Sequence, residues 1–272
     1  MSVWFITGAS RGLGLEIAKA ALARGHRVVA AVRDPDAMPA LDGDHLTVRL
    51  DVTDEHQARD AVRAALDRYD RIDVLVNNAG YGLFGAVEEI SDAEARALFD
   101  TNVFGLLNVT RAVLPAFRAQ RSGRVVNIGS IVGLAAGPAT GVYGASKYAL
   151  EGITEALNAE LAPLGGHATV VEPGSFRTGF LGSTSMRRAA ASVPEYGETA
   201  GKVIPVLAAR DGLQPGDPAK AAAAVLELVA SPAPPVRLPL GEDCVTLLES
   251  KLARVSEELE AWRETSLSTA VD

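Results

Sequence analysis

The 272-residue sequence has a single cysteine, few aromatic residues (5%) and no long apolar run. One cysteine, Cys244, excludes an intramolecular disulfide, and nothing points to an oxidising compartment. No stretch approaches the roughly 18 uninterrupted apolar residues of a membrane span, and residues 1–6 show no signal-peptide pattern. These absences predict a cytoplasmic protein that does not enter a membrane.

The sequence also has fewer positively charged residues than negatively charged ones. Lys and Arg number 26 against 34 Asp and Glu, which gives a formal net charge of −8. A surface of this sign repels nucleic acid and anionic lipid, so we expect neither as a partner. Hydrophobic residues make up 48% of the chain, enough for a compact globular protein with a large core.

Short apolar runs alternate with helical patterns along the chain. Strands are predicted at residues 3–6, 27–32, 46–50, 72–76, 124–128, 168–171 and 236–240. Helices are predicted at residues 13–23, 55–69, 143–161, 217–229 and 245–262, and from a capping box at Ser91 and Glu94 to about Gln120. This alternation predicts right-handed βαβ crossovers and an α/β fold of three layers, a doubly wound parallel sheet between helices.

We expect residues 1–272 to form a single domain, because no linker is visible before residue 174. Residues 175–216 break the alternation, with Gly, Ser, Pro and Arg among scattered bulky apolar residues. A segment this long is usually functional, which predicts a substrate-binding lid. The charged amphipathic helix predicted over residues 243–264 either caps the pocket or forms an interface, and its sequence leaves both open.

A glycine-rich turn, TGASRGLG, occupies residues 7–14 between the first strand and the first helix. Its glycines permit a tight turn and a close approach of backbone to a pyrophosphate, which would lie on the helix N–H groups. A plain tight turn is the alternative, and the position inside a βαβ unit argues against it. The predicted cofactor-binding residues here are Gly8, Ser10, Arg11, Gly12, Leu13 and Gly14.

The second strand ends in Arg33, where an acidic residue would favour NAD. Arg33 and Arg11 together would clamp a 2′-phosphate, which predicts NADP(H) as the cofactor. The alternative is that both are solvated surface charges, and the adjacent Asp34 could neutralise Arg33. Two further strand ends are predicted to complete the adenine and ribose sites: Asp51 and Val52 after the third strand, and Asn78, Ala79 and Gly80 after the fourth.

Tyr143 and Lys147 stand four residues apart at the start of a predicted helix, so their side chains share one face. Ser130 follows the fifth strand, and Asn102 lies on the preceding helical stretch. With the motifs at 7–14, Asp51, Asn77–Gly80 and Pro173-Gly174, these residues resemble the single-domain branch of the short-chain dehydrogenase/reductase family. The resemblance covers roughly residues 2–178, and residues 217–240 complete the sheet.

The resemblance implies a Rossmann-like sheet of seven strands and hydride transfer between the nicotinamide and a carbonyl or alcohol. Tyr143 would be the acid in reduction and the base in oxidation, its pKa lowered from about 10 by two to three units. Lys147 and the oxidised nicotinamide would lower that pKa, and Lys147 would also hold the nicotinamide ribose. Ser130 would bind the substrate oxygen and Asn102 a relay water. No metal site is predicted.

After the sixth strand, residues 173–178 match the family's loop on the nicotinamide side. Pro173, Gly174, Phe176 and Thr178 are predicted to bind cofactor there. The Phe176 backbone and the Thr178 hydroxyl would fix the carboxamide. Phe176 replaces the family's usual Val or Ile, and Gly129 stands where Ser is common, but neither change removes a chemical group. The resemblance also implies a homodimer or homotetramer, assembled through the helix at 103–120 and the helix after Tyr143.

An apolar pocket is predicted from residues of two segments: Leu134, Ala135, Ala136, Gly137, Phe180, Leu181 and Met186. It would favour a hydrophobic ketone, aldehyde or secondary alcohol, although the same residues could simply pack the lid on the sheet. Arg177, Arg187 and Arg188 would meet an anionic group or remain exposed charges. A catalytically silent dinucleotide sensor or scaffold is the alternative from another class, and epimerisation or dehydration with the same cofactor is a third possibility.

Overall fold

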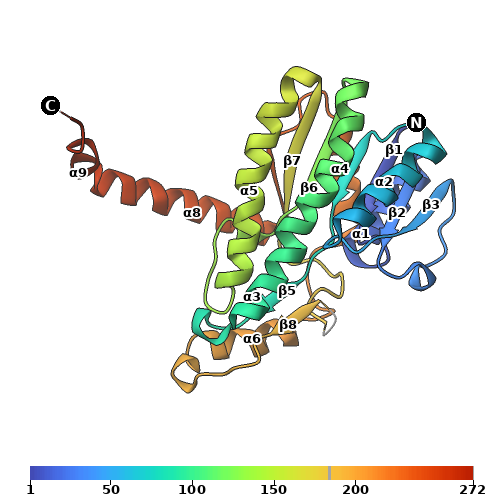
Figure 1. Ribbon diagram of the computed structural model, residues 1–272. Helices are drawn as coiled ribbons and strands as arrows, with labels where there is room; N and C mark the ends of the chain where they lie inside the picture. The colour runs from blue at the N-terminus through green and yellow to red at the C-terminus, as the bar shows by residue number, and fades with distance from the viewer. Residues whose placement is uncertain (183–184, 272) are drawn as a thin grey trace.

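The computed structural model describes residues 1–182 and 185–271, so residues 183–184 of the predicted lid and residue 272 lie outside the described part. Seven parallel strands form the central sheet, in the order β3-β2-β1-β4-β6-β7-β9 (Figure 1). They are β1 (Val3–Thr7), β2 (Arg27–Val32), β3 (His45–Arg49), β4 (Val74–Asn77), β6 (Gly123–Ile128), β7 (Gly166–Pro173) and β9 (Arg237–Leu240). The predicted Rossmann-like, doubly wound sheet is confirmed.

Helices cover both faces of this sheet. They are α1 (Gly12–Ala23), α2 (Glu55–Tyr69), α4 (Gly105–Gln120), α5 (Gly141–Leu161) and α7 (Pro218–Ala230). On one face α1 and α7 pack with Trp4 and Ile6 of β1. On the other, α2, α4 and α5 pack with Val3 and Phe5 of the same strand. Because both faces of β1 are buried, the strand appears in the sequence as an unbroken apolar run.

The predicted capping box is present at the start of α3 (Asp92–Phe99). The Glu94 N–H donates to Ser91 Oγ at 3.3 Å, and the Ser91 N–H donates to the Glu94 carboxylate at 2.9 Å. The helical stretch that follows is not uniform, because a π-helical turn at Asp100–Phe104 joins α3 to α4. Such turns are frequent at functional sites, and this one carries Asn102.

Residues 175–216 contain regular structure that their sequence does not reveal. β8 (Met186–Arg188) pairs in parallel with β5 (Gly82–Phe84), and α6 (Ala200–Ala209) follows in the same segment. Strands of three residues are too short to show an alternating pattern, and Pro205 inside α6 masks the helical signal. These elements lie together at one end of the molecule (Figure 1).

The predicted C-terminal helix is present as α8 (Glu242–Ala261), followed by α9 (Arg263–Leu267). Its first turn is anchored in the body through Cys244, which is fully buried, whereas residues 252–271 are exposed. In Figure 1 the helix projects away from the sheet, and its far end lies well away from β5, β8 and α6. Among the described residues, no helix combines the length and the apolar character that crossing a membrane requires.

Candidate active site

The loops with predicted cofactor residues leave the sheet at the carboxyl ends of β1, β2, β3, β4 and β7. Parallel strands bring these ends to one edge. The chain continues from β1 into α1 on one face and from β4 towards α4 on the other. Neighbouring strands whose connections diverge in this way form the switch point at which doubly wound sheets bind ligands.

The glycine-rich loop is shaped to let backbone approach a ligand. Gly8 and Gly12 have φ angles of 65° and 56°, which side-chain-bearing residues rarely adopt. A Cβ on Gly14 would lie 2.4 Å from Asn78 Nδ2 and 2.7 Å from the Gly8 carbonyl oxygen. The residue before α1, Arg11, makes no side-chain cap, and the first turn contains no acidic residue. These features fit a pyrophosphate bound at the helix N-terminus.

Thr7, which sequence analysis did not single out, joins this loop to the end of β4. The N–H groups of Asn78 and Ala79 donate to Thr7 Oγ1 at 2.9 and 3.0 Å. Asn78 Nδ2 in turn donates to the carbonyl oxygens of Thr7 at 2.9 Å and Gly8 at 3.2 Å. The two loops are therefore one hydrogen-bonded unit. The hydroxyl at the strand end directly before Gly8 is the sequence feature from which this role of Thr7 could have been predicted.

At the end of β2, Val32 is buried and Arg33 is exposed. The Asp34 carboxylate accepts a hydrogen bond from the Asp36 N–H at 3.2 Å and so caps the short turn that follows. Arg49, at the end of β3, donates from Nη1 to the Arg33 carbonyl oxygen at 3.2 Å. The structure thus places a second guanidinium beside Arg33, one that the sequence pattern did not indicate.

Asp51 and Val52 form the next strand end. The Asp51 carboxylate accepts hydrogen bonds from the Thr53 N–H at 3.0 Å and the Thr53 hydroxyl at 2.8 Å. Val52 is buried and packs on the first residue of α4, where a Cβ on Gly105 would lie 2.6 Å from Val52 Cγ2. Asp51 therefore stabilises the turn, and Val52 fixes it against the helix.

The loop after β7 lies directly beside the glycine-rich loop. A Cβ on Gly12 would lie 3.3 Å from the Thr178 carbonyl oxygen. Its other end is held by Asp243 at the start of α8, which accepts a hydrogen bond from the Ser175 N–H at 2.8 Å. A Cβ on Gly174 would lie 2.0 Å from Asp243 Oδ1, so a larger residue there would displace this carboxylate. Phe176 packs against the core. Sequence analysis missed the role of Asp243 because this residue lies far from the loop in the sequence.

The predicted catalytic side chains gather at the same carboxyl edge of the sheet. Tyr143 and Lys147 lie on one face of α5 and are 4% and 6% exposed, and the Ser130 side chain is hydrogen-bonded to Tyr143. Lys147 Nζ donates to the Ile128 carbonyl oxygen at 2.8 Å. A Cβ on Gly80 would lie 3.8 Å from that Nζ and 2.9 Å from Asn102 Oδ1, so Gly80 leaves room between the two.

Burial dominates the electrostatics of this group. It raises the pKa of Tyr143 to about 12, against the opposing effect of the Ser130 hydrogen bond, and it lowers the pKa of Lys147 to about 8. The family resemblance implies a lowered Tyr143 pKa, whereas the protein's own residues raise it because desolvation disfavours the phenolate. Tyr143 therefore holds its proton firmly at neutral pH in this arrangement.

The Asn102 side chain is engaged with backbone and with Ser146. Its Nδ2 donates to the Tyr81 carbonyl oxygen at 2.9 Å and to Ser146 Oγ at 3.1 Å, and its Oδ1 accepts from the Tyr81 N–H at 3.1 Å. Ser146 Oγ donates to the Tyr143 carbonyl oxygen at 2.7 Å. Asn102 thus links the residue before β5 to the first turns of α5. Its binding of a relay water stays a prediction.

An apolar cluster surrounds the Tyr143 ring. The centroids of the Phe84 and Phe180 rings lie 5.7 and 6.1 Å from its own. Leu181 and Met186 belong to the same cluster, whereas the Ala136–Gly137 stretch is exposed. The predicted pocket residues thus separate into a group around Tyr143 and a group on a neighbouring loop.

The three arginines of the predicted anion site differ in their surroundings. Arg187 stacks over the Tyr81 ring, with its guanidinium carbon 4.0 Å from the centroid. Arg177 donates to the Gln214 carbonyl oxygen at 3.0 and 3.2 Å. Arg188 is exposed. Arg177 and Arg187 are therefore held against protein groups.

Sequence analysis did not predict the buried pair of acidic residues formed by Glu172 of β7 and Glu151 of α5. Glu172 is fully buried, and burial, followed by the adjacent Glu151 carboxylate, raises its pKa to about 8. Arg237 opposes this shift, with its Nε 2.9 Å from Glu151 and 3.9 Å from Glu172. Glu151 follows Tyr143 and Lys147 on α5 at the same four-residue spacing. This spacing is the sequence feature that could have placed Glu151 on the buried face of the helix.

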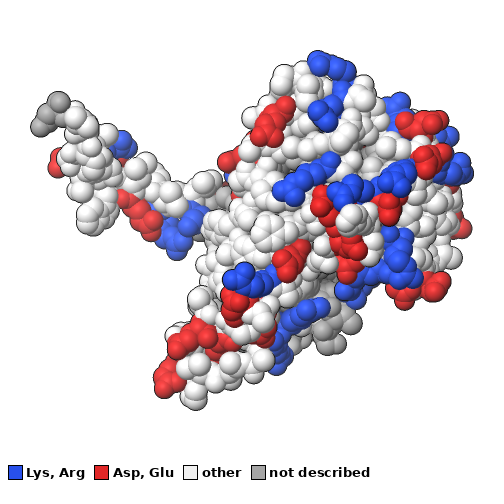
Figure 2. Space-filling model, viewed as in Figure 1, with Lys and Arg blue, Asp and Glu red and all other residues white. Residues whose placement is uncertain are grey.

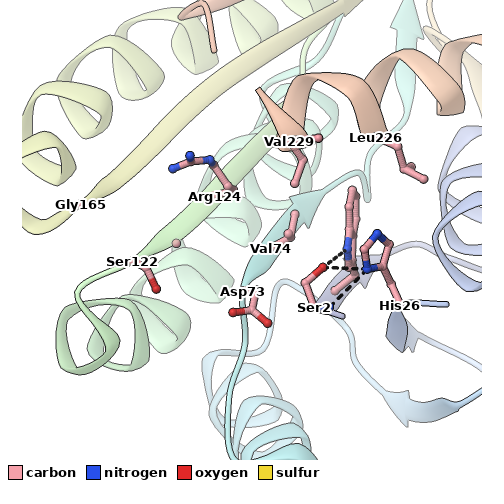
Figure 3. A pocket seen from close by; sticks show the side chains of 12 residues that line it. Ser2, His26, Asp73, Val74, Ser122, Arg124, Gly165, Leu226 and Val229 are labelled. Atoms are coloured by element: carbon pink, nitrogen blue, oxygen red, sulfur yellow. Dashed lines mark hydrogen bonds between the residues drawn. The ribbon is translucent and has the colours of Figure 1, made fainter. Parts of the chain in front are cut away.

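A separate hollow of about 350 Å³ lies at the opposite, amino-terminal edge of the sheet (Figure 3). Its lining includes Ser2, His26, Asp73 and Arg124, and Ser2 Oγ lies 3.0 Å from His26 Nδ1. These residues precede or begin strands, whereas the predicted cofactor loops follow strands. The hollow is therefore distinct from the candidate active site.

Comparison with known proteins agrees with this geometry. A family model described as short chain dehydrogenase matches residues 2–189. Oxidoreductase BOA17 of Botryotinia fuckeliana (strain B05.10) is 38% identical over 98% of this chain and 99% of its own length.

Two solved structures extend the comparison. A short-chain dehydrogenase from Streptomyces avermitilis superimposes with a TM-score of 0.92 at 40% identity, covering 99% of this chain and 100% of its own. An alcohol dehydrogenase from Thermococcus sibiricus, complexed with 5-hydroxy-NADP, gives a TM-score of 0.71 at 25% identity, covering 88% and 96%. The sequence and the fold thus match the same kind of protein.

Proposed function

This chain belongs to the short-chain dehydrogenase family, and from that premise we propose that it is an NADP(H)-dependent carbonyl reductase or alcohol dehydrogenase acting through Tyr143. Family membership makes it an oxidoreductase that uses a nicotinamide dinucleotide. The observation that carries the finer proposal is the buried pair Tyr143 and Lys147 at the carboxyl edge of the sheet, with Ser130 hydrogen-bonded to Tyr143.

NADPH, when bound, supplies the hydride that reaches the carbonyl carbon. Tyr143, with its pKa raised to about 12, retains the proton that the carbonyl oxygen needs as it becomes an alcohol. Ser130, hydrogen-bonded to Tyr143, holds that oxygen beside the phenol. In the oxidation direction Tyr143 accepts the proton, and the Ser130 hydrogen bond favours its phenolate form.

Selection of NADP(H) is assigned to the arginines at the end of β2 and β3. Arg33 is exposed, Asp34 is occupied as a turn cap, and Arg49 is anchored on the Arg33 carbonyl oxygen. With Arg11 from the glycine-rich loop, these guanidiniums suit a 2′-phosphate. Each charge-assisted contact contributes about 1.5–3 kcal/mol, or roughly 10- to 150-fold in affinity.

The substrate class follows from the apolar cluster around Tyr143. Phe84, Phe180 and Met186 enclose the phenol with apolar surface, which favours a hydrophobic ketone, aldehyde or secondary alcohol over a charged one. Residues 175–216 would act as the substrate-binding lid beside this cluster, within one domain of 1–272. The Thermococcus sibiricus neighbour is an alcohol dehydrogenase with a bound NADP derivative, which supports the same reaction type.

The test is a panel of apolar and charged carbonyl compounds, assayed with NADPH and NADH in parallel. We expect turnover of apolar ketones or aldehydes with NADPH. An Arg33→Ala variant should raise the KM for NADPH about tenfold or more and change the KM for NADH by less than threefold. Arg24→Ala, an exposed arginine at the C-terminal end of α1, is the matched control.

Two results would count against the proposal. Equal losses with both coenzymes in the Arg33→Ala variant would remove Arg33 from 2′-phosphate binding. Tight coenzyme binding with no turnover of any compound, in either direction, would favour the silent dinucleotide sensor instead.

A further inference from the structure

The projecting helix α8 carries an apolar stripe with regular spacing. Successive apolar positions, the last of them Trp262 at the C-cap directly after α8, are separated by three, four, three, four and three residues: Val245, Leu248, Leu252, Val255, Leu259 and Trp262. Alternation of three and four is the spacing of a two-helix seam, because it keeps one narrow stripe facing a partner helix. The pattern is independent of the proposed catalytic function.

This stripe is exposed to solvent along most of its length. Leu252, Leu259 and Trp262 are 61, 55 and 67% exposed. The chain's own lid cannot cover them, since the far end of α8 lies well away from β5, β8 and α6 in Figure 1. Figure 2 shows the same projection, with a broad uncharged surface beside patches of both charges. A contiguous apolar stripe of this kind indicates an interaction surface.

We propose that the stripe packs against the same stripe of a second copy of this chain, with the two α8 helices antiparallel. In this register Leu252 lies opposite Val255 of the partner subunit. Leu248 likewise lies opposite the partner's Leu259, and Val245 opposite the partner's Trp262. Every apolar position therefore finds an apolar partner, and each pairing occurs twice about the two-fold axis, as an isologous interface requires.

The charges beside the stripe complement each other in this register. Lys251 and Glu258 flank the stripe on the same side, and antiparallel pairing brings Lys251 of one helix near the partner's Glu258. The same pairing occurs twice, so two unlike pairs and no like pair form at these flanks. This complementarity favours a second copy over a partner of unrelated sequence.

The bulk of the molecule selects the antiparallel orientation. A helix of 20 residues such as Glu242–Ala261 is about 30 Å long, and antiparallel pairing places the two bodies at its opposite ends. Parallel pairing would place both bodies at the same end, with helix axes only about 8–10 Å apart. Since the bodies are far wider than this, only the antiparallel arrangement leaves them room.

An anionic membrane surface fits the helix less well. Its sequence contains six acidic residues against two basic ones, Lys251 and Arg254. Amphipathic helices that lie on anionic lipid are instead rich in Lys and Arg on their polar face. The charge of α8 therefore favours a protein partner with both signs of charge.

The first experiment compares the solution mass of two full-length variants with that of the unmodified protein across a dilution series. Leu252→Glu/Leu259→Glu places charge on the stripe, whereas Ser250→Glu/Ala253→Glu places the same charge on the opposite face. Sedimentation velocity should show at least a twofold lower mass for the stripe variant and no change for the control. Circular dichroism at room temperature should show the same fold for all three, because these positions are exposed in the single chain.

The second experiment tests the direction of pairing by oxidative cross-linking. Mixed Leu248→Cys and Leu259→Cys proteins should form a disulfide-linked dimer, and Leu259→Cys alone should not. The native Cys244 is buried and leaves little background. Equal masses for the stripe variant and its control would overturn the proposal. So would cross-linking of Leu259→Cys with itself, or an unmodified monomer that co-floats with phosphatidylserine vesicles.

Discussion

The hydrogen bond between Ser130 and Tyr143 is the interaction that opposes the effect of burial on the phenol. Burial raises the pKa of Tyr143 to about 12, and the Ser130 bond lowers it. A hydrogen bond to a charged group contributes about 1.5–3 kcal/mol, and one pKa unit corresponds to about 1.4 kcal/mol. Ser130→Ala should therefore raise the pKa of Tyr143 by about one to two further units.

The effect should be visible in alcohol oxidation, where Tyr143 accepts a proton. The ascending limb of the pH–rate profile should move upward by about one to two pH units, and the rate at a fixed pH below it should fall about 10- to 100-fold. The assay follows absorbance of the reduced nicotinamide with saturating oxidised coenzyme. Ser130→Thr retains a hydroxyl and should keep the limb near its original position. A limb that stays in place in Ser130→Ala would refute the reasoning.

Two further predictions concern the cofactor loop and the buried acid. Gly14→Ala places a Cβ 2.4 Å from Asn78 Nδ2, so this variant should lose about 1–3 kcal/mol of stability in thermal unfolding and should bind the coenzyme more weakly. The control is Gly152→Ala, which has open space around it and should be neutral or stabilising in the same measurement. The raised Glu172 pKa of about 8, against an ordinary 4.5, contributes stability that is full below pH about 4.5 and lost as the pH rises through about 8. The melting temperature should fall across that window and fall less in Glu172→Gln; equal slopes would contradict this.

The sheet and its crossovers were predictable because their signals are local. Each central strand is buried on both faces, so a run such as Val28–Val32 stands out without knowledge of its neighbours. Caps such as Ser91 with Glu94 depend on residues three apart, and the structure has them. The three-residue strands β5 and β8 were not predictable, because their pairing joins segments about 100 residues apart.

The site divides in the same way. The residues of each motif are placed together by the strand ends, but their supports come from distant positions: Asp243 holds the loop at Gly174, and Arg49 reaches the Arg33 carbonyl oxygen. The direction of the Tyr143 pKa shift depends on burial, which spacing does not reveal. The sequence identified which groups are present, and the packing determined how strongly each holds its proton.

The central claim is that the Tyr143 hydroxyl donates the proton in carbonyl reduction, and Tyr143→Phe tests it most directly. The variant keeps the ring that packs with Phe84 and Phe180, so NADPH should bind within a few fold of the unmodified protein by fluorescence titration. Steady-state reduction of the best ketone or aldehyde should fall by at least about 100-fold. Turnover within threefold of the unmodified protein, with NADPH bound normally, would contradict the account.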